Sequence, residues 1–346
     1  MAGKKILILG NGFDLAHDFP TRYGDFLERC KTRSFQKMLP QIKNNIWIEY
    51  FKEIYDENGI KEENWVDFES EMSIIIRFID KSSENLLREY DTLFPGTKHI
   101  ESEKKDDYEK MKKFDENLFK ICKAENHRKF IPPNAKYYFK MPIKNLRKRC
   151  FEDLERLIYA LEQYLIEVAE KKDADKLSII ENIHPDYIIN FNYTHTYERL
   201  YNDKIPVFHI HGECGKKENN MVLGIDEYWT DEECDNHANF AIFKKFVQRV
   251  QQKTGTTHIK WLNEIHKIYQ AENEMSDIYT FGHSLDITDK DILQGFFTSA
   301  ATRIHIYCKD KKNEGELMAN VIKLMEEKKF LQKVNQESPK IEFIIQ

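Results

Sequence analysis

Short apolar runs alternate with helix-like stretches in this chain, and this alternation constrains its fold more than any other feature. Seven runs are predicted as strands: 4–9, 186–191, 206–211, 221–225, 277–282, 303–308 and 341–346. Segments with helical periodicity separate most of the later ones, at 236–252, 257–272, 287–300 and 313–330. Strands that alternate with helices indicate a mostly parallel sheet covered by helices on both faces. The expected fold class is therefore α/β.

Residues 24–183 have a different character. They are rich in Glu, Lys, Leu, Ile and Phe at helical spacing, and the segments 64–90 and 151–170 have strongly amphipathic helical patterns. The charge run 170–176 is interpreted as a solvated helix face. Almost no strand signal interrupts this zone. We therefore predict a large all-helical insertion in an α/β domain formed by residues 1–23 and 184–346.

Composition narrows the classes of function. The chain has 346 residues and a net charge of −6, which gives no overall attraction to nucleic acid or to an anionic membrane. No apolar run approaches the roughly 20 residues of a membrane span. The six cysteines are scattered and form no Cys-x-x-Cys pair, so neither a zinc ribbon nor a disulfide framework is expected. Without a signal-peptide pattern, we expect a cytoplasmic protein.

The first apolar run ends in Gly10-Asn11-Gly12-Phe13-Asp14. Glycines permit positive φ and let backbone N–H groups approach a phosphate closely, so this turn is a candidate nucleotide site. The dinucleotide fingerprint requires Gly or Ala five residues after the first glycine, where this chain has Leu15. A simple tight turn therefore stays open as the alternative. Asp14 is either a ligand-binding carboxylate or a helix-capping residue.

Small polar residues and histidines also follow the other predicted strands. Because the carboxyl ends of parallel strands meet at one edge, where doubly wound sheets bind ligands, we predict a single crevice there. Besides the glycine turn, its candidate residues are Asn190, Asn192, Tyr193, Thr194, His211, Gly282, His283, Ser284 and Asp289. For this last turn the alternative is that Ser284 or Asp286 caps helix 287–300.

The paired asparagines and histidines admit several roles. Asn190 and Asn192 alternate along an extended segment, so they share one face and are suited to hold a water or a ribose hydroxyl, with an Asx-turn as the alternative. His209 and His211 also share a face, and two histidines at this spacing can bind a metal ion. His211 precedes a glycine at a strand end, where it is a candidate general base.

Four of these motifs resemble, in the same order, those of the bacterial abortive-infection AbiH family, which is itself similar to sirtuin-like NAD-binding domains. They are the glycine turn with Pro20 six residues after Asp14, Asn192-Tyr193, His211-Gly212, and Gly282-His283-Ser284-Leu285. The likeness covers the α/β zones and implies a Rossmann-like, sirtuin-like fold. Within the insertion, Trp65, Asp67 and Glu69 look like a signature specific to AbiH proteins.

The resemblance implies NAD⁺ hydrolysis in anti-phage defence. The zinc-binding cysteine pairs of sirtuin deacetylases are absent, which argues against protein deacylation, and Asp14 replaces the sirtuin serine. By this interpretation Asn192 positions a water and His211 accepts a proton from that water or from a ribose hydroxyl. Backbone N–H groups at 10–14 and 282–285 hold the pyrophosphate, NAD⁺ is the substrate, and no metal is required. The insertion is the expected contact for a second copy or a regulatory partner.

Two other classes of function stay open. One is a sensor or interaction module that binds NAD⁺ or ADP-ribose without turnover and signals through the insertion. The other is a metal-dependent nuclease or phosphohydrolase that uses His209, His211 and Asp226.

Overall fold

The computed structural model describes residues 2–58, 68–69, 72–73, 76, 143–225, 238–335 and 338–346. The chain divides into two compact units. The α/β unit comprises residues 1–22, 162–222 and 248–346, and the helical unit comprises 23–161 and 223–247. The α/β unit thus includes residues 162–183, which the sequence patterns assign to the insertion. The helical unit includes residues 223–247, which those patterns assign to the α/β domain.

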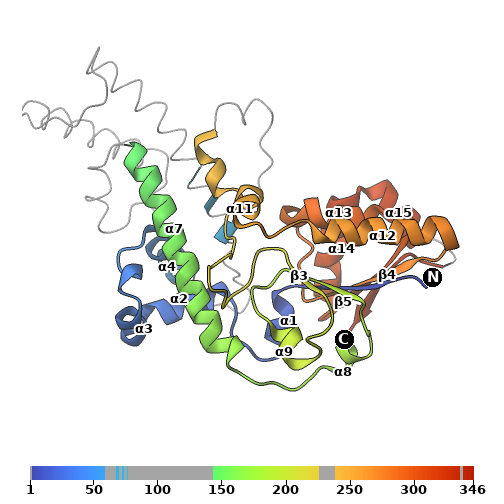
Figure 1. Ribbon diagram of the computed structural model, residues 1–346, viewed down its shortest axis with the longest axis horizontal. Coiled ribbons are helices and arrows are strands. Elements are labelled where there is room, and N and C mark those ends of the chain that lie inside the picture. Colours follow the sequence, from blue (N-terminus) through green and yellow to red (C-terminus); the bar gives the residue numbers. More distant parts are fainter. Residues whose placement is uncertain are drawn as a thin grey trace, which may run out of the picture. The chain divides into compact units, whose positions relative to one another are not determined.

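A single six-stranded sheet, in which every strand is parallel to its neighbours, forms the centre of the α/β unit (Figure 1). Its strands are β1 (Lys5–Leu9), β2 (Tyr187–Asn190), β3 (Val207–His209), β4 (Ser276–Phe281), β5 (Thr302–Cys308) and β6 (Ile341–Ile345). They lie in the order β3-β2-β1-β4-β5-β6, which is the order of Rossmann dinucleotide-binding folds. The predicted α/β class with a parallel sheet is confirmed. The strand order reverses between β1 and β4, and this boundary is the switch point where such sheets bind ligands.

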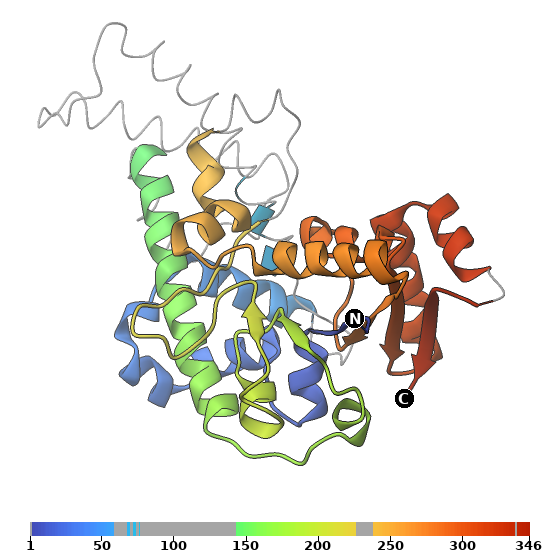
Figure 2. The same cartoon turned by 45° about the vertical axis from the view of Figure 1, so that its right-hand side comes forward.

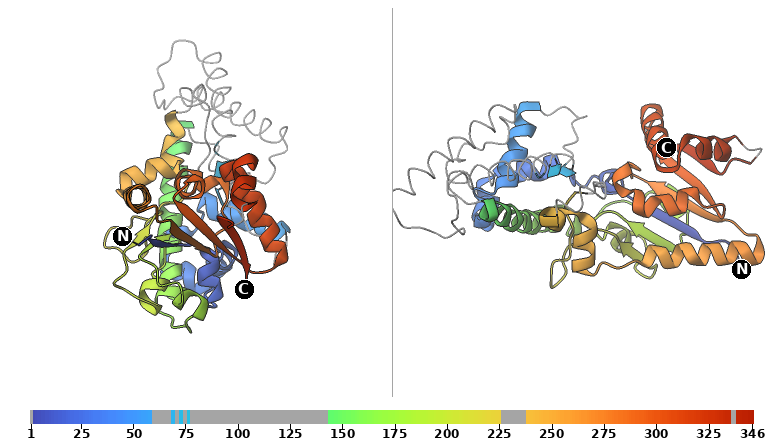
Figure 3. Two further views of the ribbon diagram at one scale, coloured as in Figure 1. Left: turned by 90° about the vertical axis from the view of Figure 1, so that its right-hand side faces the viewer. Right: turned by 90° about the horizontal axis from the view of Figure 1, so that it is seen from above.

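Helices cover both faces of the sheet (Figures 1, 2 and 3). The helices of this unit are α1 (Asn11–Ala16), α8 (Ser178–Glu181), α9 (Thr196–Leu200), α12 (Thr257–Glu272), α13 (Lys290–Thr298), α14 (Lys311–Met325) and α15 (Glu327–Val334). In β1, Ile6 and Ile8 point into the core beneath α12–α15, whereas Leu7 and Leu9 point into the core beneath α1, α8 and α9. Successive residues of β1 therefore face opposite layers of helices. After Lys5 the strand is apolar because both of its faces are buried.

The helical unit has an aromatic core. Its elements are α2 (Tyr23–Lys31), α3 (Arg33–Met38), η1 (Pro40–Ile42), α4 (Ile46–Asn58), most of α7 (Ile143–Leu165) and the 3-10 segment η5 (Ala238–Phe243). Trp47 packs against Phe51 and Phe243, and Phe51 stacks on Phe68 at a centroid distance of 3.9 Å. α7 continues as one π-helical turn, η4 (Ile166–Glu170), which belongs to the α/β unit.

Several predicted elements differ from those observed. The predicted strand 221–225 is wrong, because this buried segment has only an isolated bridge between Ile225 and Lys244. The predicted helix 313–330 is two helices, α14 and α15, separated at Glu326, where φ is +71°. The predicted helix 287–300 begins with the 3-10 turn η6 (Ile287–Asp289) before α13.

The segment predicted as helix 236–252 is described from residue 238 and consists of η5 followed by α11 (Lys245–Gln252). Most of the predicted helix 64–90 lies outside the described residues. Within the described part of the chain, no helix combines the length and the apolar character that crossing a membrane requires.

Candidate functional site

The glycine turn after β1 packs directly against the turn after β4. The N–H of Gly10 donates to the carbonyl of Phe281 at 3.1 Å, and the N–H of Gly12 donates to the carbonyl of Gly282 at 2.8 Å. A Cβ on Gly12 would lie 2.6 Å from the Cα of Gly282. A Cβ on Gly282, where φ is +67°, would lie 2.3 Å from the nitrogen of Phe13. Glycine is therefore required here because two backbones meet at the switch point.

Several backbone N–H groups that were predicted to bind phosphate already have acceptors within the protein. The N–H groups of Gly10, Gly12 and Phe13 all donate to carbonyls within the two turns, and that of Leu285 donates to His283 Nδ1. Asn11 differs from them. Its Oδ1 accepts a hydrogen bond from Thr21, and its buried Nδ2 has no acceptor among the described residues. Asn11 therefore has an unsatisfied buried donor in the glycine turn, whereas the neighbouring backbone N–H groups already have acceptors.

Three predicted residues gather at the same edge of the sheet, and we call His211, His283 and Asp289 the His211 cluster. Asp289 Oδ1 lies 3.4 Å from His211 Nε2, and Asp289 Oδ2 lies 3.5 Å from His283 Nε2. All three residues are buried, with 6%, 7% and 9% of their surfaces exposed. One carboxylate is thus shared by two imidazoles that follow β3 and β4.

Local geometry holds His283 in one orientation. The turn that carries it has positive φ at Gly282 and at Leu285, and the Leu285 N–H donates to His283 Nδ1 at 2.9 Å. An acceptor at Nδ1 leaves the proton of the neutral ring on Nε2, which faces Asp289. The ring of Phe191 meets the rings of both histidines edge-on, at centroid distances of 5.6 Å to His211 and 4.2 Å to His283.

The two predicted asparagines brace the turn after β2. Asn190 Oδ1 accepts the N–H of Asn192, and Asn190 Nδ2 donates to the carbonyl of Thr194. Asn190 therefore makes the Asx-turn that was the alternative to ligand binding. Asn192 Nδ2 donates to the carbonyl of Gly10 at 2.9 Å, and no described residue donates to its Oδ1. Asn192 thus links the β2 turn to the glycine turn.

Asp14 joins α1 to the segment that follows β2. Its carboxylate is 1% exposed and accepts hydrogen bonds from the hydroxyls of Thr194, at 2.7 Å, and Thr196, at 2.6 Å. Burial raises the pKa of Asp14 to about 6, although both hydrogen bonds act in the opposite direction. Neither oxygen caps α1.

The remaining predicted residues have separate environments. The hydroxyl of Tyr193 donates to the carbonyl of Val222, and Ser284 is exposed and accepts a hydrogen bond at its carbonyl from Asn320. Glu69 contacts Lys245 within the helical unit. Trp65, Asp67 and Asp226 lie outside the described residues.

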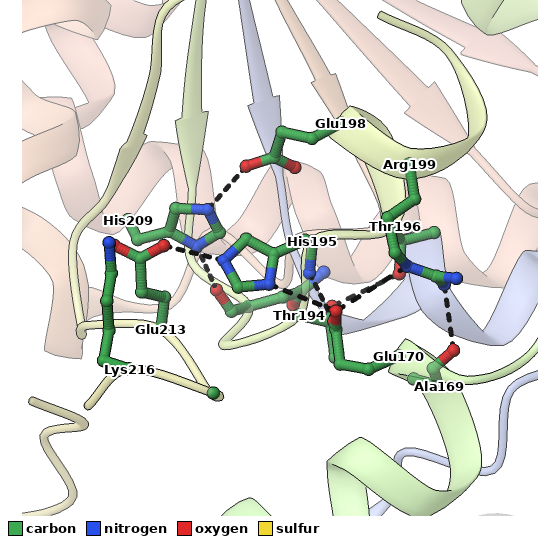
Figure 4. Close-up of polar contacts among 12 residues, drawn as sticks. Ala169, Glu170, Thr194, His195, Thr196, Glu198, Arg199, His209, Glu213 and Lys216 are labelled. Atoms are coloured by element: carbon green, nitrogen blue, oxygen red, sulfur yellow. Dashed lines mark hydrogen bonds and ion pairs between the residues drawn. The ribbon is translucent and has the colours of Figure 1, made fainter. Parts of the chain in front are cut away.

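A second group of histidines and carboxylates lies at the ends of β2 and β3, and Figure 4 shows it in detail. We call His195, His209, Glu170, Glu198 and Glu213 the His195 cluster. His195 lies between Glu170 Oε2, 3.2 Å from its Nδ1, and Glu213 Oε2, 2.7 Å from its Nε2. His209 Nε2 contacts Glu198 Oε1 at 2.8 Å, and its Nδ1 contacts the carbonyl of Asn192 at 3.1 Å.

His209 and His211 therefore belong to different clusters, although the predicted strand 206–211 placed them on one face. β3 ends at His209, and Gly212, with φ of +78°, turns the chain away.

The charges of the His195 cluster are strongly coupled. Hydrogen bonds to Cys214, Glu170 and Glu213 raise the pKa of His195 to about 12. The hydrogen bond from His195 lowers the pKa of Glu213 to about 2. His195 is thus a cation held between two carboxylates at neutral pH. Of this cluster the sequence patterns marked only His209 as a candidate ligand, and they grouped it with His211, because the five members come from three segments with no common spacing.

A cavity of about 720 Å³ adjoins the His195 cluster. Its lining includes Glu198, His209 and Glu213, together with Lys216 and Lys253. It includes no member of the His211 cluster. The α/β unit thus combines a buried cluster near the switch point with an open, charged cluster at the β2–β3 side.

Comparison with known proteins identifies one family. A family model described as bacteriophage abortive infection AbiH matches residues 6–308, from β1 to the end of β5. The matched segment contains the glycine turn and both histidine clusters. No curated protein and no solved structure matches the chain.

Proposed function

This chain belongs to the bacteriophage abortive infection AbiH family, and we propose that it acts in abortive infection by hydrolysing NAD⁺ at the bond between nicotinamide and ribose. The sequence likeness to sirtuin-like domains supports the dinucleotide as substrate. The observation that carries the proposal is the position of the His211 cluster at the carboxyl edge of a sheet whose strand order is that of dinucleotide-binding folds. Loss of NAD⁺ would arrest the infected cell before phage are released.

Hydrolysis requires a base rather than a strong acid. A water attacks the anomeric carbon of the ribose, the carbon–nitrogen bond breaks, and nicotinamide leaves as a neutral molecule with the bonding electron pair. His211 takes the proton from the attacking water, and ADP-ribose is the second product. Asp289 lies 3.4 Å from His211 Nε2, so its carboxylate stabilises the imidazolium that forms. This step uses only residues of this chain and the attacking water, and it needs no metal ion.

The neighbouring side chains position the reactants. Asn192 is anchored through its Nδ2 to Gly10, and its Oδ1 is available to hold the water. His283 fixes the second oxygen of Asp289. Asn11 Nδ2 offers a hydrogen bond to the dinucleotide at the switch point. The contacts predicted between the pyrophosphate and the backbone N–H groups at 10–14 and 282–285 stay predictions. In this conformation several of these N–H groups donate to carbonyls of the protein.

Nicotinamide release from NAD⁺ by the purified protein tests the proposal. We expect His211→Ala and Asn192→Ala to lower release by about 100-fold or more. His266→Ala is the matched control, because His266 contacts Ser299 from α12 and belongs to neither histidine cluster. Wild-type turnover in both site variants would contradict the mechanism. Saturable NAD⁺ binding without release, and without loss of cellular NAD⁺ during infection, would favour the sensor function.

An enzyme that destroys NAD⁺ must be restrained between infections. We propose the helical residues 24–183 as the contact for a second copy or a regulatory partner. Light scattering of the purified chain, with and without phage-infected lysate, would measure a change in its assembly.

A further inference from the structure

We propose that His195, His209 and Glu213 bind a zinc ion whose fourth coordination position opens into the adjoining cavity. One ring nitrogen of each histidine and one carboxylate oxygen of Glu213 all lie within 4.8 Å of one another. Imidazole nitrogen and carboxylate oxygen are ordinary zinc ligands, with bonds of about 2.0–2.2 Å. Small side-chain movements would bring three such atoms around one ion.

The surroundings of the two histidines match those of metal-binding histidines. Glu170 contacts Nδ1 of His195, and Glu198 contacts Nε2 of His209 (Figure 4). A carboxylate on one ring nitrogen fixes the orientation of a metal-bound histidine and makes its other nitrogen a better ligand. Each histidine of this pair has such a carboxylate.

Three carboxylates surround the two rings and favour a cation between them. Glu170 and Glu213 contact His195, Glu198 contacts His209, and the centroids of the two rings lie 5.2 Å apart. A divalent ion bound between the rings would therefore be attracted by the negative charge around it.

A neighbouring set of ligands is less suitable. Glu170, His195 and Cys214 also come within 4.8 Å of one another. However, Glu170 Oε2 is already shared between His195 and Arg199, whose Nε lies 3.7 Å away. A guanidinium beside this oxygen would repel a cation. Glu213 Oε2, in contrast, contacts His195 alone among the described residues, since Lys216 contacts the other oxygen.

The cavity gives this zinc an open position. His209 and Glu213 both line it, as do Lys216, Lys217 and Lys253. Three protein ligands and one open position are typical of catalytic rather than structural zinc sites. The lysines favour water or a small anion as the fourth ligand. The ion takes no part in the hydrolysis proposed for His211.

Zinc titration of the full chain, after chelator treatment and dialysis, tests this site. We expect one zinc ion per chain, and binding weakened by more than about 100-fold in Glu213→Gln and in His209→Gln. His305→Gln is the matched control, because His305 also lies between two carboxylates, Asp277 and Glu342, but belongs to no group of possible metal ligands among the described residues. It should bind zinc like the wild type.

X-ray absorption of the zinc-loaded wild type keeps the test independent of variants that fail to fold. We expect nitrogen and oxygen ligands at about 2.0–2.1 Å, including two imidazoles, and no sulfur. A sulfur ligand, wild-type binding in both site variants, or no stoichiometric zinc would overturn the proposal. None of these measurements uses NAD⁺, so the proposed zinc site and the proposed hydrolase activity can be refuted independently.

Discussion

The buried carboxylate of Asp14 makes the stability of the protein depend on pH in a direction opposite to that of most aspartates. Its two oxygens accept hydrogen bonds from Thr194 and Thr196, and no cation pairs with it at hydrogen-bond distance among the described residues. Asp14→Asn removes the charge and keeps the size of the side chain. The threonine hydroxyls can rotate, so one of them can accept a hydrogen bond from the new amide.

The size of this change in stability follows from the pKa of Asp14. Burial raises the pKa of Asp14 from 3.8 to about 6 in the folded protein. The folded state therefore holds this proton more tightly than the unfolded state, and stability falls as the pH rises from about 4 through 6. A difference of about two pKa units corresponds to about 3 kcal/mol, of which slightly more than 1 kcal/mol is lost between pH 5 and pH 7. Asp14→Asn should lack this loss.

Thermal unfolding from pH 4.5 to pH 7.5 measures the effect. The variant should gain stability relative to the wild type as the pH rises, and the gain should level off above pH 7. Asp310→Asn is the matched control, because Asp310 is exposed and caps α14 by accepting the Asn313 N–H. Asparagine caps helices as well as aspartate does. A difference between Asp14→Asn and wild type that does not change with pH would refute the reasoning and indicate a carboxylate open to water or ligand.

Two further predictions concern the switch point. Gly282→Ala should destabilise the protein by more than about 2 kcal/mol, because φ is +67° and the new Cβ would lie 2.3 Å from the Phe13 nitrogen. Gly315→Ala in α14 is its control and should stabilise the protein by about 0.5–1 kcal/mol, since nothing lies within 4 Å of its Cβ position. Equal urea midpoints for the two variants would contradict the packing argument. Asp289→Asn should lower nicotinamide release by about 100-fold at pH 7.5 while NAD⁺ still binds by calorimetry, and an unchanged rate would remove Asp289 from the proposed mechanism.

The strands of the sheet were predictable because burial makes each of them a short run rich in apolar residues, most completely in β1, where Ile6, Leu7, Ile8 and Leu9 are all buried. The six observed strands fall inside, or within one residue of, predicted runs. The seventh run, 221–225, is also apolar and buried, but Val222 donates its N–H to the carbonyl of His211, and no strand in the described part of the chain pairs with the run. Hydrophobicity indicates that a segment is buried. Whether a buried segment forms a strand depends on a neighbouring strand that can pair with it.

The His211 cluster was partly predictable for a topological reason. Its three members follow β3 and β4, and the parallel topology brings those strand ends to one edge of the sheet. The His195 cluster depends on packing that no pattern reports. Glu170 lies in a charge run interpreted as a solvated face, yet its side chain is only 15% exposed and accepts hydrogen bonds from His195. The solvated-face interpretation is therefore wrong at this residue, which is the last residue of the π-helical turn η4.

Asn192 connects the two clusters through different atoms, which makes them separable by experiment. Its backbone carbonyl contacts His209, whereas its side-chain amide donates to Gly10 at the switch point. Asn192→Ala removes the second contact and leaves the carbonyl in place. Zinc affinity should therefore survive a substitution that abolishes NAD⁺ hydrolysis. If both were lost together in a folded protein, the turn after β2 would have to be held by the side chain itself, and the two sites would act as one.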